Sequence, residues 1–157
     1  MKLMMFDLEN TVIQHWTDRS LCWVDSNTKF LQECQPDDVG IFSFALWCDE
    51  NIKEFTDSGM KARLESVYDI VIPDNLIIHV DEMHAATLQA AERDRSRVDG
   101  KNDEKFHAFY DWCEANQDSL SKYDEVWLVD DTVDDEIITD FDFKVVLRNP
   151  VVIQSFL

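Results

Sequence analysis

Two short apolar segments that each end in an aspartate constrain the fold of this chain more than any other feature. The first covers residues 3–6 and stops at Asp7, and the second covers residues 126–129 and stops at Asp130. A four-residue apolar run that stops at a carboxylate is typical of a buried parallel strand, which delivers a polar group to the carboxyl edge of its sheet. The sequence therefore predicts that these two aspartates meet at one sheet edge.

Further acidic residues follow both segments. Glu9 comes two residues after Asp7, just before an Asn10-Thr11 pair that suits a tight turn out of the strand, and a second acidic run begins at Asp130. Mg²⁺ prefers oxygen ligands and is usually bound through carboxylates. We therefore predict one Mg²⁺ site, with candidate ligands Asp7, Glu9, Asp130, Asp131 and Asp135.

The rest of the chain alternates between strand-like and helix-like segments. Further strands are expected at residues 39–46, 68–72 and 144–147, and helices at residues 26–34 with Ser26 as the cap, 49–67, 82–93, from about 101 onward, and 133–138. This alternation predicts an α/β protein, a doubly wound three-layer sandwich with a mostly parallel central sheet. The whole chain, 1–157, is read as a single domain in which residues 74–100 form a small insertion or an extra edge hairpin.

A polar break separates two apolar-rich runs directly after the first strand. The runs cover residues 12–16 and 21–24, and the four polar residues between them include Arg19. Two such runs around a four-residue break predict a β-hairpin flap over the end of the first strand. Arg19 would lie at the tip of this flap and is a candidate substrate-binding residue.

The charge of the chain limits its function. With 33 acidic and 14 basic residues, the net charge is -19, which repels the phosphates of nucleic acids and the anions of membranes. Direct nucleic-acid binding is therefore disfavoured, and no apolar segment is long enough to predict a membrane span. The four cysteines are spread singly and no signal peptide is recognisable, which favours a reducing, cytoplasmic location.

Four motifs in order along the chain resemble those of the haloacid dehalogenase-like (HAD) superfamily of phosphohydrolases. That family combines a strand ending in D-x-D-x-T/V, a strand ending in Ser or Thr, a lysine at or before the start of a helix, and a strand ending in DD or GD with a further Asp about four residues later. The matching segments are Asp7-Leu8-Glu9-Asn10-Thr11, Ser43 within Ile41-Phe42-Ser43-Phe44, Lys101 or Lys105, and Asp130-Asp131-Thr132-Val133-Asp134-Asp135.

The resemblance implies a Rossmann-like fold and a Mg²⁺-dependent phosphatase with a small cap or none. Asp7 would attack phosphorus to form an aspartyl-phosphate, and Glu9 would transfer the proton. Ser43 and a lysine would hold the phosphoryl oxygens; Lys101, just before the helix, is slightly preferred over Lys105 in its first turn. The open site would suit a phosphorylated substrate such as a nucleotide, a nucleic-acid end or a phosphoprotein.

One position departs from the family pattern and keeps a second class of function open. Relatives usually carry Asp where this chain has Glu9, which keeps the carboxylate but adds a methylene group. The alternative is a catalytically inactive relative that acts as an acidic binding protein and mimics nucleic-acid charge toward a basic partner. The individual site residues also have structural alternatives: Ser43 could be a satisfied core hydroxyl, and the acids from Asp130 to Asp135 could form a solvated helix start.

Overall fold

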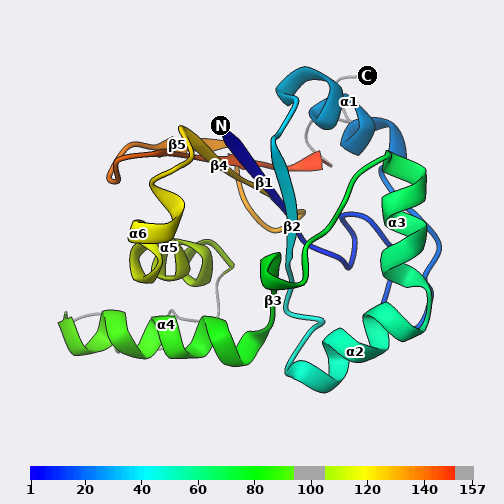
Figure 1. The fold of residues 1–157 in the computed structure, drawn as a ribbon, viewed down its shortest axis with the longest axis horizontal. Helices are drawn as coiled ribbons and strands as arrows, with labels where there is room; N and C mark the ends of the chain where they lie inside the picture. Colours follow the sequence, from blue (N-terminus) through cyan, green and yellow to red (C-terminus); the bar gives the residue numbers. More distant parts are fainter. Residues whose placement is uncertain (94–104, 151–157) are drawn as a thin grey trace.

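The computed structural model describes residues 1–93 and 105–150 of the chain (Figure 1). Its centre is one six-stranded sheet in the order β3-β2-β1-β4-β6-β5. The strands are β1 Lys2–Phe6, β2 Asp38–Phe42, β3 Ile77–Ile78, β4 Glu125–Val129, β5 Glu136–Ile138 and β6 Lys144–Arg148. Neighbouring strands are parallel except for β5 and β6, which are antiparallel. The predicted α/β class with a mostly parallel sheet is therefore confirmed.

Helices cover both faces of the sheet (Figure 1). They are α1 Val24–Cys34, α2 Asp49–Asp57, α3 Met60–Tyr68, α4 Val80–Arg93, α5 Lys105–Ala115 and α6 Gln117–Leu120, with a short 3₁₀ turn, η1, at Asp74–Leu76. Side chains of β1 alternate between two buried clusters: Leu3 and Met5 pack with α4, α5 and α6, while Met4 and Phe6 pack with α1, α2 and α3. Burying each such side chain contributes about 1.5–3 kcal/mol to stability, so this packing holds the helices against both faces of the sheet.

The region between α2 and β3 differs from the prediction. The expected helix over 49–67 is broken at Gly59, whose φ of 84° is a conformation that glycine adopts without a steric penalty. The expected strand over 68–72 is absent, because α3 runs to Tyr68 and the backbone N–H of Ile72 donates to the Glu65 carboxylate at 2.9 Å. The edge strand is instead β3, which pairs in parallel with β2.

The structure also corrects three other boundaries. The prediction of a helix at 133–138 is wrong, because residues 136–138 form β5 and pair with β6. Helix α1 begins at Val24, so Ser26 lies buried inside it and is not its cap. Strand β2 ends at Phe42, four residues before the predicted end.

Two predicted features stay predictions. In the region of the expected flap, Ile13 and Leu21 form an isolated antiparallel bridge, and no strand is assigned among the described residues there. Residues 74–100 contribute η1, β3 and α4, but 94–100 lie outside the described residues, as does the expected helix start at 101–104.

The order of the strands reverses direction beside β1, which makes this the topological switch point of the sheet. From β1 the chain moves outward to β2 and β3, and later returns to the other side of β1 to form β4. Phe6 and Val129 are partners in the ladder, and the N–H of Asp7 donates to the carbonyl oxygen of Val129 at 3.0 Å. Ligand sites of open α/β sheets lie at the carboxyl ends of the strands at such a switch point, and here that edge carries Asp7 and Asp130.

Candidate functional site

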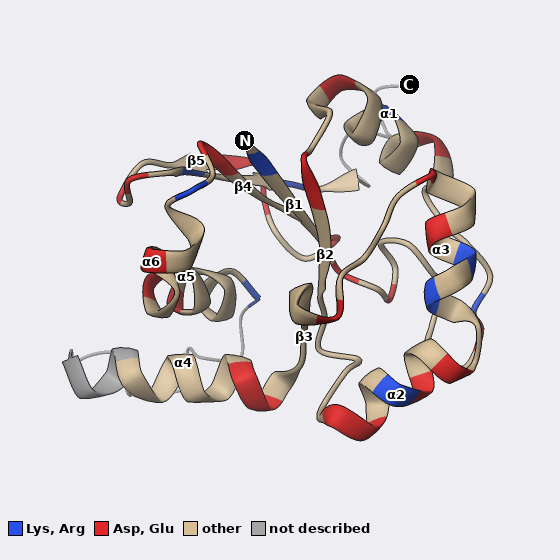
Figure 2. Ribbon diagram, in the orientation of Figure 1, with Lys and Arg blue, Asp and Glu red and all other residues tan. Residues whose placement is uncertain are grey.

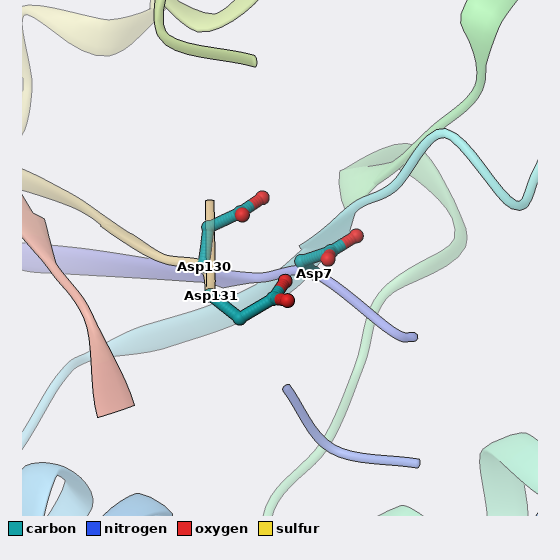
Figure 3. Close-up of side chains that lie close together, drawn as sticks. All are labelled: Asp7, Asp130 and Asp131. Carbon is teal, nitrogen blue, oxygen red and sulfur yellow. The ribbon is translucent and has the colours of Figure 1, made fainter. Parts of the chain in front are cut away.

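Three carboxylates converge at the ends of β1 and β4. Asp7, Asp130 and Asp131 each offer one oxygen, and these oxygens lie within 4.8 Å of one another, so the group could hold a metal ion. Figure 3 shows the carboxylate of Asp131 next to that of Asp7. Asp130 is fully buried, Asp7 is 7% exposed and Asp131 is half-buried. Burial of acidic groups at this density is costly unless cations compensate their charge.

Lys105 supplies the positive charge of this cluster. Its Nζ lies 3.0 Å from Asp7 Oδ1 and 3.0 Å from Asp130 Oδ2, and the side chain is buried. Three carboxylates against this one ammonium leave a net charge of −2 when all are ionised. Asp130 Oδ2 is buried without a well-aligned hydrogen bond from any described residue, despite the nearby Lys105. A cation facing this edge would complete the environment of the carboxylates.

The environment shifts the protonation of these groups. Burial, opposed by Lys105 and reinforced by Asp130, raises the pKa of Asp7 from 3.8 to about 6. Burial and Asp130 also raise the pKa of Asp131 above its ordinary value. Burial opposes the charge of Lys105, but Asp7 and Asp130 outweigh it and raise the pKa of the lysine. At neutral pH Asp7 is therefore mainly a carboxylate and Lys105 an ammonium.

Backbone geometry after β1 places a hydroxyl between two of the carboxylates. The N–H groups of Thr11, Val12 and Ile13 all point to the carbonyl oxygen of Leu8, which closes a tight turn. Asn10 has a φ of 60° in this turn, a left-handed conformation that Asn tolerates better than most residues. The Thr11 hydroxyl lies 3.5 Å from a carboxylate oxygen of Asp7 and accepts the N–H of Asp131 at 3.1 Å.

Polar residues after β4 and β6 hold the second half of the site. Thr132 donates to Asp130 Oδ1 from both its N–H, at 2.7 Å, and its hydroxyl, at 2.6 Å. The Asn149 side chain donates to the carbonyl oxygens of Asp131 and Val133 at 3.0 and 2.9 Å. None of Thr11, Thr132 and Asn149 was predicted as a ligand or catalytic residue, although Thr11 was expected in the turn after the first strand. A signal existed for Asn149, because it follows an apolar strand as Asp7 does.

The predicted residues divide into those that the structure brings to the cluster and those that it places elsewhere. Lys105 contacts Asp7, although Lys101 was slightly preferred from the sequence; Lys101 lies outside the described residues. Ser43 is buried directly after β2, and its hydroxyl accepts the Ala45 N–H at 3.1 Å. It opposes the rise in the pKa of Asp7.

Three further predicted residues lie outside the three-carboxylate cluster. Glu9 Oε2 accepts the N–H of Trp16 at 3.0 Å and lies 3.1 Å from His15 Nε2. Asp135 Oδ1 accepts the backbone N–H of Asn149 at 2.8 Å and so supports the loop after β4. Arg19 binds Glu54 at 2.9 Å, so its guanidinium joins the region after β1 to α2.

A cleft of about 760 Å³ opens over the cluster. Its acidic lining residues are Asp7, Glu9, Asp130, Asp131, Asp134 and Glu136. Its apolar lining comes from Phe44, Ala45, Phe106, Val133 and Leu147, and Lys105 lies at its base. The cleft is therefore large enough for a small organic molecule, and both charged and apolar groups line it.

Comparison with protein-family models, curated proteins and solved structures gave no match for this chain. Within the part of the chain that the structure describes, no helix is long and apolar enough to cross a membrane.

We predict that the metal-free protein loses stability relative to the Asp7→Asn variant as the pH rises from about 4 to about 6. Because the pKa of Asp7 is raised in the folded state, the folded protein keeps a proton that the unfolded chain releases in this range. The unfolding free energy of the wild type minus that of the variant should fall by roughly 2 kcal/mol between about pH 4 and about pH 6. Urea unfolding at each pH measures this difference.

Asp118→Asn serves as the control, because Asp118 is an exposed acid on α6. Its stability should follow that of the wild type across the range. Parallel pH profiles for wild type and Asp7→Asn would contradict the raised pKa of Asp7.

Proposed function

We propose that this protein is a Mg²⁺-dependent phosphatase that hydrolyses phosphate monoesters through a phosphorylated Asp7. The observation that carries the proposal is the position of Lys105, whose ammonium lies 3.0 Å from both Asp7 and Asp130 at the switch point of the sheet. A buried cation beside a nucleophilic carboxylate stabilises the negative charge that spreads over the phosphoryl oxygens during transfer. The HAD resemblance of the sequence supports the same reading.

The donor set suits Mg²⁺. Asp7, Asp130 and Asp131 offer hard oxygen ligands, and their net charge with Lys105 matches a divalent cation in magnitude. Asp7 and Asp131 would hold the ion, with Asp130 beside them. When bound, Mg²⁺ would neutralise phosphoryl oxygens and so lower the repulsion between substrate and carboxylates.

The residues of the chain would carry the two steps as follows. A carboxylate oxygen of Asp7 forms a bond to phosphorus while the bond between phosphorus and the leaving oxygen breaks. The leaving oxygen keeps the electron pair of the broken bond and receives a proton from Glu9. Water then gives a proton to Glu9 and attacks phosphorus, and the bond between phosphorus and Asp7 breaks to release phosphate. Lys105 and Ser43 hold the phosphoryl oxygens throughout.

Glu9 would act from a fixed position in spite of its longer side chain. Both contacts of its carboxylate, with His15 and with the N–H of Trp16, use Oε2, so proton transfer would fall to Oε1. An aspartate at this position is one methylene shorter and would draw away from both partners. The pocket is therefore better suited to glutamate than to the residue that HAD phosphatases usually carry.

Mg²⁺ should raise the melting temperature of the wild type, because it binds the folded site and relieves repulsion among its carboxylates. At a concentration one hundred times the dissociation constant, the gain is about 2.7 kcal/mol. Asp131→Asn should remove most of this gain. Differential scanning calorimetry with Mg²⁺ and with a chelator measures it.

Asp134→Asn is the matched control for this measurement. Asp134 lines the cleft but lies outside the three-carboxylate cluster, so its variant should keep the gain. An equal gain in wild type and Asp131→Asn would place the metal elsewhere.

Phosphate release should separate the roles of Asp7 and Glu9. Asp7→Asn should abolish it, because an amide cannot attack phosphorus. Glu9→Gln should slow substrates with poor leaving groups about 10²–10⁴-fold and an activated aryl phosphate much less, because only a poor leaving oxygen needs the proton. Glu9→Asp should also be slower than wild type, through loss of the contacts with His15 and Trp16.

Two results would count against this assignment. A Glu9→Asp variant faster than wild type would mean that the extra methylene compromises the site. A wild type that releases no phosphate from aryl, nucleotide, polynucleotide-end or phosphopeptide substrates with Mg²⁺ would remove the phosphatase proposal.

A second proposal, an acidic protein that binds a basic partner, rests on the net charge of -19 and its distribution. Acidic residues are spread over α1, α2, α3 and the start of α4, far beyond the cluster (Figure 2). Such a protein should retain basic nucleic-acid-binding proteins in a salt-sensitive way, and Asp7→Asn should leave this retention unchanged. No retention at low salt would remove this second proposal.

A further inference from the structure

Each of the two residues proposed to hold the phosphoryl group is followed directly by a phenylalanine that lines the cleft. Phe44 comes after Ser43 at the end of β2, and Phe106 comes after Lys105 at the start of α5. The Lys105 Nζ lies 4.6 Å from the centre of the Phe44 ring. Two rings therefore line the cleft beside the residues proposed to hold the phosphoryl group.

Phe44 is open to the cleft although it is a large apolar residue. Its side chain is 37% exposed, whereas Phe42, two residues earlier and the last residue of β2, is fully buried. Phe106 is partly buried against the core, and the centre of its ring lies 6.2 Å from that of Tyr110. A fixed ring and an exposed ring beside a polar site are typical of a surface that binds an apolar part of a ligand.

The charge of the cleft limits what the leaving group can carry. Six carboxylates line it, and Lys105 is the sole Lys, Arg or His among the described residues that do so. That lysine already lies between Asp7 and Asp130. Lys105 and a divalent cation would both contact one phosphoryl group, but a second anionic group would face Asp134 and Glu136, with no further Lys, Arg or His among the described lining residues beside it.

We propose that the cleft selects phosphate monoesters whose leaving group carries a flat, uncharged ring, and that Phe44 and Phe106 determine this specificity. The inference rests on the proposed function and names the substrate class of the same site. The rings contact the face or edge of the ligand ring, a contact worth about 0.5–1.5 kcal/mol beyond apolar burial, which corresponds to about 2- to 12-fold in affinity. The additional phosphates of polyphosphates and of internal segments of nucleic acid would face the acidic side chains that line the described part of the cleft, so these ligands should bind more weakly.

Three phosphonates test this specificity, because their C–P bond is not hydrolysed and binding can be measured without turnover. Benzylphosphonate carries a flat ring, cyclohexylmethylphosphonate a puckered ring of similar size, and 4-carboxybenzylphosphonate a flat ring with a second anion. Titration calorimetry of the wild type with Mg²⁺ should rank their affinities in that order. The flat ring should bind about 3- to 10-fold more tightly than the puckered one.

Matched variants show which residues produce the preference. Phe44→Leu and Phe106→Leu should each reduce the ratio between benzyl and cyclohexylmethyl ligands, while Phe44→Tyr should keep it because the ring remains. Phe141→Leu is the control, since Phe141 stacks on other aromatic residues outside the cleft lining. Its ratio should equal that of the wild type, and thermal unfolding confirms that each variant is folded.

The outcomes separate this inference from the proposed function. Phosphate release from benzyl phosphate without a preference for the flat ring, or a preference unchanged in both Leu variants, overturns the inference while the phosphatase stands. Ring preference in binding without release of phosphate from any ester overturns the phosphatase while the ring site stands. A wild type that binds none of the phosphonates overturns the inference as well.

Discussion

The contact on which the site depends is the buried ion pair network of Lys105 with Asp7 and Asp130. The lysine is 98 residues from Asp7 in the sequence, so the network forms only when α5 is docked against the ends of β1 and β4. A buried ammonium without partners is strongly destabilising, and two carboxylates at 3.0 Å compensate it. The start of α5 is thereby fixed at the edge of the sheet where ligands bind.

The same network leaves the site in electrostatic imbalance. Lys105 compensates one negative charge, and Asp7 and Asp131 keep a raised pKa because burial and the charge of Asp130 disfavour their ionisation. Thr11, Thr132 and Asn149 hold these groups in place through hydrogen bonds, without adding positive charge. A rigid arrangement of acids that costs stability in the absence of a cation is a reasonable basis for a metal-dependent function.

The sequence alone predicts the parts of this structure that depend on local pattern. The runs before Asp7 and Asp130 indicate β1 and β4, because an apolar segment this short that ends in an acid fits poorly anywhere except at a buried strand end. The mostly parallel sheet follows from the alternation of elements. Kinship with HAD phosphatases remains a hypothesis, supported by the ordered motifs and by the position of Lys105.

Features that depend on the three-dimensional position of particular side chains were predicted less well. Residues 68–72 are as apolar as many strands, but the carboxylate of Glu65 accepts a hydrogen bond from the N–H of Ile72. The edge strand forms later in the chain, at β3. The choice between Lys101 and Lys105 depends on where α5 docks, which spacing does not determine. The pairing of Glu9 with His15 likewise depends on the turn around Asn10, whose geometry no sequence pattern specified.

The most direct test of the account is chemical trapping of the nucleophile. Borohydride reduces an aspartyl-phosphate to homoserine, and peptide mass spectrometry locates the altered residue. Wild type quenched with borohydride during turnover of an aryl phosphate with Mg²⁺ should carry homoserine at position 7 and nowhere else among its acidic residues. Release of phosphate with Asp7 unmodified, or trapping at another acid, would contradict the central claim that Asp7, held by Lys105, receives the phosphoryl group.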